Sequence, residues 1–292
     1  MKGGFPMDKL TDCFKLSNGV EIPCLGYGTF LTPSGDICKE GVKKALEIGY
    51  RHIDTAFAYG NEESVKDGIA ASGISRKDIF ITTKHWITAR GYEKTVEAID
   101  TSLKNLGTDY IDLYLIHWPC VAAVDPNWKE VNASTWRGFE EAYKAGKIRA
   151  IGLSNFERKH LDALYETCEI KPMVNQIEYH PGWLQEDTVN YSKENDIVVE
   201  AYMPLGGGKL LEFDGLKKIA AKYDKTTAQI CLRFVLQNGV LPLCKSITPE
   251  RILSNTQIFD FELSAEDMQE INSYPKMAFT GWVPEEAPAD NL

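Results

Sequence analysis

Residues 49–84 read GYRHIDTAFAYGNEESVKDGIAASGISRKDIFITTK, a stretch in which a strand, a helix and a second strand follow one another. The first predicted strand ends at Asp54, Tyr59 follows five residues later, and the second strand ends at Lys84. Parallel strands joined by helices have their C-terminal ends on one side, where such proteins place their reactive groups. A carboxylate, a phenol and an amine on that side predict a proton donor with partners that tune its acidity.

The next predicted strand repeats this arrangement and adds a fourth polar group. Residues Tyr110–Ile116, YIDLYLI, form a strongly β-prone run that ends at His117. We therefore expect His117 to join the three earlier side chains at the mouth of three consecutive strands.

The rest of the chain continues the alternation of strands and helices. Eight candidate strands lie within about 220 residues, at Cys24–Gly26, Arg51–Ile53, Ile79–Thr83, Tyr110–Ile116, Ala150–Leu153, Met173–Gln176, Val198–Ala201 and Leu241–Leu243. Helical patterns occur at Ile37–Glu47, Glu62–Ala71, Tyr92–Leu106, Ser134–Ala145, Lys159–Thr167, Glu186–Asn195, Gly215–Tyr223, Thr227–Leu236 and Pro249–Gln257. This count predicts an α/β fold, the (β/α)8 TIM barrel. A doubly wound open sheet has the same alternation, but no strand here leads into the GxGxxG turn of that fold.

The two ends of the chain fall outside this alternation. Residues Phe14–Ile22 read as two short strands around Asn18-Gly19, a strong hairpin signal, and predict an N-terminal β-hairpin that plugs the barrel floor. Residues 274–292 are rich in Pro, Glu and Ala and predict an irregular C-terminal tail. No composition break marks a linker, so we expect one domain over residues 1–292. The segment 117–134 predicts a long functional loop at the catalytic end of the barrel.

Composition limits the partners of this chain. The net charge of −10 argues against binding to nucleic acid or an anionic membrane, because both require a basic surface. The seven cysteines are an odd number without a CxxC pair, which favours reduced thiols in a cytosol over a disulfide framework. The N-terminus lacks the apolar run of a signal peptide, and no segment approaches the roughly 18 apolar residues of a membrane span. We therefore expect a cytoplasmic protein.

Seven short motifs follow one another in the order and spacing of one known family. They are GYRHIDTAFAYGNE, the strand ending in TTK, the IHWP turn, GLSNF at 152–156, NQIEYHP at 175–181, AYMPLG at 201–206 and CKSITPERILSN at 244–255. Together they resemble the aldo-keto reductase superfamily, over about residues 14–268. The resemblance implies a barrel enzyme that reversibly reduces an aldehyde or ketone to an alcohol with a nicotinamide cofactor.

The four strand-end groups suit this chemistry. Carbonyl reduction requires a hydride donor and an acid that protonates the developing alkoxide. Tyrosine is a poor acid at neutral pH, with an ordinary pKa of about 10, and a nearby ammonium lowers that value. Lys84 can supply this charge to Tyr59, and Asp54 can hold Lys84 in place. His117 can orient the substrate carbonyl, so the four residues match the Asp, Tyr, Lys, His tetrad of aldo-keto reductases.

Residues for the phosphate end of the cofactor are expected late in the chain. Lys245 and Ser246 follow a predicted strand, and Thr248 with the next proline opens a helix whose free amides favour phosphate. With Arg251 they form a basic pocket in an acidic chain. In the family, matching residues hold the adenosine 2′-phosphate, so the resemblance implies NADPH. Ser254 stands where relatives usually carry Glu, and this departure leaves use of NADH possible.

The resemblance also implies residues for the rest of the cofactor. The matching positions are Ser154, Asn155, Gln176, Tyr202, Leu205, Gly206 and Asn255. The first three match the group that fixes the nicotinamide carboxamide, and Tyr202 matches the aromatic residue that stacks under the ring. Met203 replaces a serine that is often found there and is expected to remove a pyrophosphate contact. Three glycines at 206–208 predict a loop that folds over the pyrophosphate.

Aromatic side chains are expected to line the substrate pocket. The candidates beside His117 are Phe30, Trp86, Trp118 and Trp282. Aromatic walls suit apolar or ring-shaped carbonyl compounds. Phe30 stands where many relatives have Trp, which predicts a slightly wider pocket. Trp128 and Trp136 are expected to be packing residues.

Two other classes are open at this point. A non-catalytic barrel that senses nucleotides would share the fold, but it would not need to retain Tyr59 and His117. A metal-dependent hydrolase barrel is disfavoured because the five histidines form no HxH or HExxH pattern, so no metal is expected. Among these histidines, His52 is expected to point outward to a helix, His160 to lie on a helix surface, and His180 to be structural.

These inferences favour a monomeric, cytoplasmic aldo-keto reductase that prefers NADPH. Its expected partner is a small-molecule carbonyl substrate.

Overall fold

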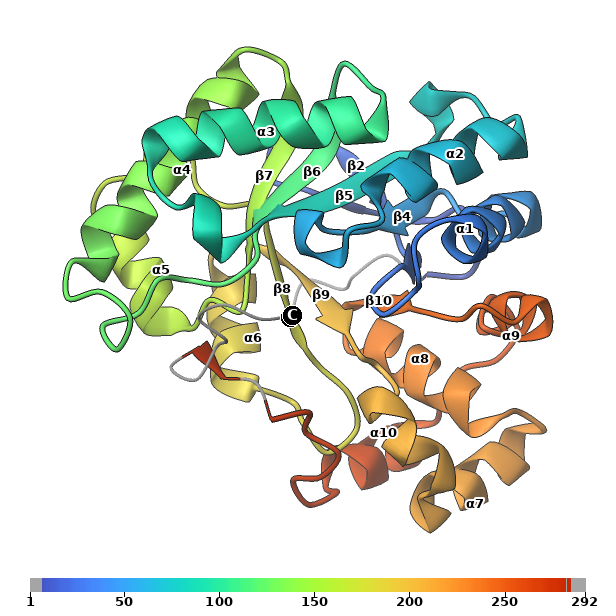
Figure 1. Cartoon of the computed structure of the whole chain (residues 1–292). Coiled ribbons are helices and arrows are strands. Elements are labelled where there is room, and N and C mark those ends of the chain that lie inside the picture. The colour runs from blue at the N-terminus through green and yellow to red at the C-terminus, as the bar shows by residue number, and fades with distance from the viewer. Residues whose placement is uncertain (1–6, 282, 285–292) are drawn as a thin grey trace.

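Eight parallel strands form a closed barrel in the computed structural model, which describes residues 7–281, 283 and 284 (Figure 1). The strands are β3 (Gly26–Gly28), β4 (His52–Asp54), β5 (Phe80–His85), β6 (Ile111–Ile116), β7 (Ile148–Ser154), β8 (Val174–Glu178), β9 (Val198–Tyr202) and β10 (Leu241–Cys244). Each strand pairs with the next along the chain, and β10 closes the circle on β3. The predicted (β/α)8 TIM barrel is therefore confirmed.

Helices surround the barrel on its outer side (Figure 1). They are α1 (Asp36–Ile48), α2 (Glu62–Ser72), α3 (Tyr92–Leu106), α4 (Trp128–Lys144), α5 (Arg158–Tyr165), α6 (Glu186–Glu194), α7 (Asp214–Tyr223), α8 (Thr227–Gln237), α9 (Pro249–Ser254) and α10 (Ala265–Asn272). Because helices cover the outside and side chains fill the inside, the barrel strands are buried on both faces and consist largely of apolar residues.

Strand β6 shows how a charged residue is accommodated in such a strand. All six of its residues are buried, including Asp112. The Asp112 carboxylate accepts hydrogen bonds from Arg76 at 2.7 Å and from Arg149 at 2.5 Å. The two guanidinium groups compensate the buried charge of Asp112, so residues Ile111–Ile116 can form a continuous strand. His117 follows the end of this strand, at the mouth of the barrel.

The predicted hairpin is present at the N-terminus. Strands β1 (Cys13–Lys15) and β2 (Glu21–Pro23) pair antiparallel, and Gly19 in the turn has a φ of 86°. Leu16 and Ile22 are buried in the main hydrophobic core, and the Asn18 side chain donates to the carbonyl of Arg149 at 2.9 Å. Since Arg149 lies at the start of β7, the hairpin covers the N-terminal end of the barrel, away from the strand ends that carry the tetrad.

Several observed elements differ in their bounds from the predicted ones. The first barrel strand is Gly26–Gly28 rather than Cys24–Gly26, because Cys24 still belongs to the hairpin connection. Helix α4 begins at Trp128 rather than Ser134, which shortens the expected loop 117–134 to residues 117–127. Helix α10 has no counterpart among the predicted elements, although Ser264 caps it by accepting a hydrogen bond from the Asp267 amide.

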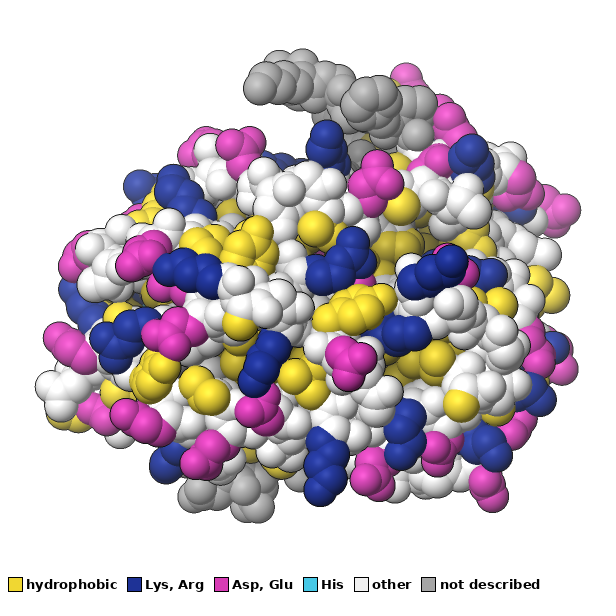
Figure 2. All heavy atoms as spheres, turned by 90° about the horizontal axis from the view of Figure 1, so that it is seen from above, with side chains coloured by type: hydrophobic (Ala, Val, Ile, Leu, Met, Phe, Trp, Pro, Cys, Tyr) yellow, Lys and Arg dark blue, Asp and Glu magenta, His cyan; other side chains and the backbone are white. Residues whose placement is uncertain are grey.

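Positive and negative side chains are mixed on the surface. The face in Figure 2 shows Lys and Arg side chains interspersed with Asp and Glu, with hydrophobic side chains between them. Within residues 7–281, 283 and 284, no helix has the length and hydropathy needed to cross a membrane.

Candidate active site

Four polar side chains predicted from the strand ends lie together at the mouth of the barrel. Asp54 is the last residue of β4, and Tyr59 ends a short 3₁₀ helix, Phe57–Tyr59, that follows it. Lys84 lies near the end of β5, and His117 directly follows β6. Three adjacent strands thus bring the four groups into one cluster, as expected.

Lys84 is the centre of this cluster. Its ammonium nitrogen Nζ lies 2.7 Å and 2.8 Å from the two carboxylate oxygens of Asp54, and it donates to the Thr55 carbonyl at 2.9 Å. It also donates to the hydroxyl of Tyr59 at 3.3 Å. The lysine is completely buried. A buried ammonium is stable only when it is paired and hydrogen-bonded, and these contacts meet that requirement.

The acidity of Tyr59 reflects two opposing effects. Burial raises the pKa of the Tyr59 phenol, the Lys84 charge lowers it, and the Asp54 charge raises it again. The pKa of Tyr59 ends above its ordinary value, so the net direction is opposite to the lowering expected from the sequence. Lys84 itself is held in its charged form, because Asp54 and Tyr59 outweigh the burial that lowers its pKa and the net pKa is raised.

His117 is a neutral imidazole at this site. Burial, followed by the charges of Lys84 and His85, lowers its pKa well below the ordinary value. Its Nδ1 atom is buried without a hydrogen-bond partner among the residues that the structure describes. A hydrogen on Nδ1 would be a buried unsatisfied donor, which favours the tautomer that carries the hydrogen on Nε2. The ring packs edge-on against Tyr59 at 5.6 Å and against Trp86 at 5.1 Å between centroids.

Asn155 joins three strand ends on the opposite side of the mouth. Its Nδ2 donates to the His117 carbonyl at 3.0 Å and to Ser154 Oγ at 3.1 Å, and its Oδ1 accepts from the hydroxyl of Tyr202 at 2.9 Å. Asn155 has a φ of 64°, a left-handed conformation that asparagine tolerates better than most residues. The hydroxyl bond holds the partly exposed Tyr202 ring by its edge, which leaves ring faces for stacking.

Gln176 has both amide hydrogens committed to carboxyl groups. Its Nε2 donates to Asp54 Oδ2 at 3.0 Å and to Glu200 Oε2 at 2.8 Å. Because both Asp54 oxygens accept hydrogen bonds from the Lys84 ammonium, the amide nitrogen of Gln176 must face this carboxyl group and the amide oxygen Oε1 must face elsewhere. Gln176 therefore offers an acceptor, which fits the amide hydrogens of a nicotinamide carboxamide.

The residues predicted for the cofactor phosphates lie around the end of β10. Lys245 and Arg251 are exposed, and Lys245 donates to the Leu31 carbonyl at 3.4 Å. Thr248 is the N-cap of α9, but its side chain makes no capping hydrogen bond. Instead, Ser246 Oγ accepts from the Thr248 amide at 3.0 Å. The exposed side chains of Lys245 and Arg251, beside this turn, could bind an anionic group.

Asn255 is the C-cap residue of α9, and its contact with the cofactor stays a prediction. Its side chain is buried and hydrogen-bonds Cys244, which lies at the end of β10. The contact with Cys244 connects the end of α9 to β10.

The Gly206–Gly208 segment follows β9 with all three glycines at positive φ. Met203 has a φ of 48°, a conformation that is costly for a residue with a long side chain, and its carbonyl accepts from the Gly206 amide at 2.8 Å. Leu205 packs on the hydrophobic core. A Cβ atom on Gly206 would lie 2.7 Å from that of Ala278, so this segment packs against the residues after α10.

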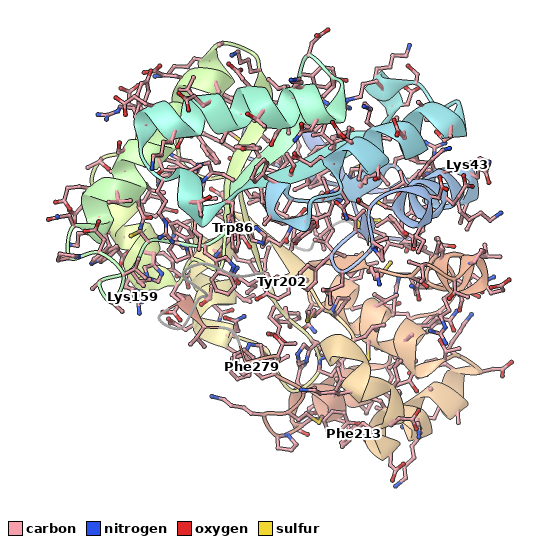
Figure 3. The ribbon with its side chains drawn as sticks, viewed as in Figure 1. Lys43, Trp86, Lys159, Tyr202, Phe213 and Phe279 are labelled. Atoms are coloured by element: carbon pink, nitrogen blue, oxygen red, sulfur yellow. The ribbon has the colours of Figure 1, made fainter. Side chains whose placement is uncertain are left out.

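The part of the tail that the structure describes is fastened to the end of β8. Glu178 accepts hydrogen bonds from the amide of Thr280 at 3.1 Å and from its hydroxyl at 2.6 Å. Phe279 stacks on Trp183 with ring centroids 4.2 Å apart. In Figure 3, Phe279 lies below Tyr202.

Three of the four predicted pocket aromatics lie at the mouth. Trp86 and Trp118 form a small buried cluster with Ile87, and Figure 3 places Trp86 beside the barrel centre. The Phe30 ring lies 5.1 Å from the Tyr59 ring. Trp282 is outside the described residues. Trp128 and Trp136 are packing residues as expected, with Trp128 against His160 and Trp136 stacked on Phe139.

Two histidine predictions are wrong. His52 points into the barrel, where its Nε2 lies 2.9 Å from Thr82 Oγ1 and 3.9 Å from Glu200 Oε1. His160 is buried rather than on a helix surface, and its Nδ1 accepts from the Glu157 amide at the start of α5. Strand alternation carries a signal for the first case, because His52 precedes the inward-facing Asp54 by two residues. Glu200 was not predicted as a site residue. The same alternation gives a signal for it, because Glu200 precedes Tyr202 by two residues on β9.

Comparisons with known proteins identify the family of this chain. The model of the Aldo/keto reductase family matches residues 25–275, so the chain belongs to that family. It is 48% identical over 277 residues to the glyoxal reductase of Bacillus subtilis (strain 168), covering 95% of this chain and 98% of that protein.

Solved structures of this family superpose closely. MGS-M4, an aldo-keto reductase from a Medee basin deep-sea metagenome library, gives a TM-score of 0.85 at 48% identity and covers 90% of this chain and 95% of its own. A Bombyx mori aldo-keto reductase in complex with NADP gives a TM-score of 0.83 at 37% identity, with coverage of 91% and 93%.

Proposed function

We propose that this aldo-keto reductase uses NADPH to reduce an aldehyde or ketone to an alcohol, and that Tyr59 is the general acid. The observation that carries the proposal is the position of the buried Lys84 ammonium, 2.7 Å from Asp54 and 3.3 Å from the Tyr59 hydroxyl. Membership of the family and the similarity to a glyoxal reductase support the carbonyl reaction.

Each tetrad residue has one task in this proposal. A bound reduced nicotinamide supplies the hydride that adds to the carbonyl carbon. Tyr59 gives its phenolic proton to the carbonyl oxygen, and Lys84 stabilises the phenolate that develops. Asp54 keeps Lys84 charged and in place. His117 donates a hydrogen bond from Nε2 to the same oxygen and orients the carbonyl. In the reverse direction the phenolate takes the alcohol proton.

The cofactor residues divide into two groups. At the nicotinamide end, Gln176 supplies an acceptor and Tyr202 a stacking surface, while Ser154 and Asn155 fix the carboxamide. At the other end, the exposed cations Lys245 and Arg251 favour the 2′-phosphate of NADPH over the uncharged hydroxyl of NADH. The complex of the Bombyx mori relative with NADP supports this choice.

The decisive experiment follows the loss of NADPH absorbance with an activated aromatic aldehyde, repeated with NADH. We expect turnover with NADPH and slower turnover with NADH at equal concentrations. NADPH binding without reduction of any carbonyl compound in a panel of small and aromatic aldehydes would contradict the enzyme proposal and favour a nucleotide sensor. The single domain over residues 1–292, the monomeric state and the cytoplasmic location stay predictions, and size-exclusion chromatography and limited proteolysis test the first two.

A further inference from the structure

A second layer of polar side chains lies inside the barrel, directly beneath the tetrad. It consists of His52 on β4, Thr82 on β5, Gln176 on β8 and Glu200 on β9, each at most 2% exposed. Gln176 connects this inner polar layer to the tetrad, because its amide nitrogen bridges Asp54 and Glu200 at 3.0 Å and 2.8 Å. Burying a glutamate completely inside a barrel costs free energy, so we expect Glu200 to have a specific role.

The surroundings of Glu200 favour the neutral carboxylic acid over the carboxylate. The nearby ammonium of Lys84 is already paired with Asp54. One carboxyl oxygen of Glu200, Oε1, is buried without a hydrogen-bond partner in the described part of the chain. An ionised carboxylate with an unpaired buried oxygen beside a second carboxylate would lose far more solvation than it regains. Burial, followed by the Asp54 charge, accordingly raises the pKa of Glu200 to about 8.

The Asp54 carboxylate sets which way the Gln176 amide faces, and Glu200 is the second acceptor that holds the amide there. With one amide hydrogen on Asp54 and the other on Glu200, the side chain cannot rotate by 180° without placing its oxygen against the Asp54 carboxylate. Without Glu200, one hydrogen would lose its acceptor and the amide would be held by Asp54 alone.

We propose that Glu200 is a positioning residue which, as a neutral acid, shares the Gln176 amide with Asp54 and so holds the Gln176 oxygen toward the nicotinamide carboxamide. The inference rests on the proposed function, since it needs a nicotinamide at this mouth. It adds a residue that acts through Gln176 and touches neither substrate nor cofactor.

A change in the charge of Glu200 alters the preference between the two cofactor forms. The titratable groups that face Glu200 are His52 and Asp54 from β4 and Lys84 from β5, while β8 presents Gln176 and β10 pairs Leu241 with it. His52 is neutral, because burial and the Lys84 charge lower its pKa to about 3. Ionised Glu200 adds one negative charge beneath the ring site. The oxidised ring is cationic and the reduced ring is neutral, so this charge favours NADP⁺.

The test measures dissociation constants of NADPH and NADP⁺ by quenching of tryptophan fluorescence between pH 6 and pH 9. We expect E200A to weaken NADPH about tenfold, the size of one lost buried hydrogen bond. E200Q keeps an acceptor for Gln176 and should restore most of that affinity. In wild type, the affinity for NADP⁺ should increase relative to that for NADPH as pH rises through about 8, where Glu200 ionises. E200Q should lose this change.

The control is E140Q, because Glu140 on α4 is also a buried carboxyl but accepts from the backbone amides of Glu169 and Ile170, away from the mouth. It should bind both cofactor forms as wild type does. Infrared difference spectra provide a readout without cofactor, since the stretch of a protonated carboxyl should be present in wild type and absent in E200Q.

The outcomes separate the two proposals. Equal NADPH affinity in wild type and E200A, or a pH change that persists in E200Q, overturns the positioning role while leaving the reductase proposal intact. Absence of the carboxyl band overturns it even if E200A does not fold. Failure of wild type to bind NADPH overturns the proposed function, and the inference with it.

Discussion

The Lys84 ammonium lies 2.7 Å from Oδ1 of Asp54, and neither side chain is more than 5% exposed. Such a pair is expensive to bury, and removing one partner leaves the other as an uncompensated charge. The pair therefore connects stability to catalysis, because the same ammonium contacts the hydroxyl of Tyr59.

Replacing Asp54 by Asn should show this connection. We expect D54N to lose about 3–5 kcal/mol of unfolding free energy, the usual result of breaking a buried pair. Urea unfolding measures the loss. The matched control is D100N, which breaks the exposed pair with Lys147 and should cost at most about 1 kcal/mol. Similar losses in the two variants would mean that the pair at the mouth is solvated like a surface pair.

The two cations near β10 should discriminate between the cofactors. K245A and R251A should each weaken the binding of NADPH by about tenfold to a hundredfold, the range for a hydrogen bond to a charged group. The dissociation constant of NADH should change by no more than about twofold. Fluorescence titration with both cofactors measures this. K217A removes an exposed lysine on α7 that pairs with Glu212, and it serves as the control. Parallel losses for NADPH and NADH would show that neither side chain reads the 2′-phosphate.

Stability should depend on pH through Glu200. Its pKa is about 8 in the folded protein and about 4.5 in the unfolded chain, so the folded state holds the proton more tightly. The stabilisation from this proton is complete below pH 4.5 and is lost as pH rises to about 8. E200Q cannot ionise, so its melting temperature relative to wild type should increase over that range. A constant difference from pH 5 to pH 9 would contradict the raised pKa.

The size of the pocket should respond to Phe30, whose ring lies 5.1 Å from that of Tyr59. F30W should lower kcat/KM for an aromatic aldehyde by about tenfold, because a larger side chain excludes a ring more than a small carbonyl compound. The comparison is with a two-carbon aldehyde under the same conditions. An equal effect on both substrates would place Phe30 outside the substrate pocket.

Much of this architecture could be predicted from the sequence. Eight apolar runs separated by helical patterns indicate the barrel, and each tetrad residue follows or ends one of those runs. The orientation of His52 could not be predicted from apolarity, because a barrel strand is buried on both faces. Only its alternation with Asp54 distinguishes inside from outside. The contacts of Glu200 were equally hidden, since they depend on how strands β4, β8 and β9 meet across the barrel.

Other features arise from contacts between distant segments. The start of α4 at Trp128 lacks a helical apolar pattern, and its first aromatic residue packs instead on His160 of α5. The attachment of Thr280 to Glu178 joins residues that are far apart in the chain, and a tail rich in Pro, Glu and Ala carries no local signal for it.

The most direct test of the account is the single-turnover reduction of an aromatic aldehyde by wild type and Y59F, with the dissociation constant of NADPH measured for both. Y143F, which alters a partly buried tyrosine of α4 whose hydroxyl accepts a hydrogen bond from Asn18, is the control. The account predicts that Y59F binds NADPH within about twofold of wild type and reduces the aldehyde roughly 10²–10⁴-fold more slowly, the usual contribution of a general acid. A Y59F rate close to that of wild type, with NADPH bound, would contradict the assignment of Tyr59 as the proton donor.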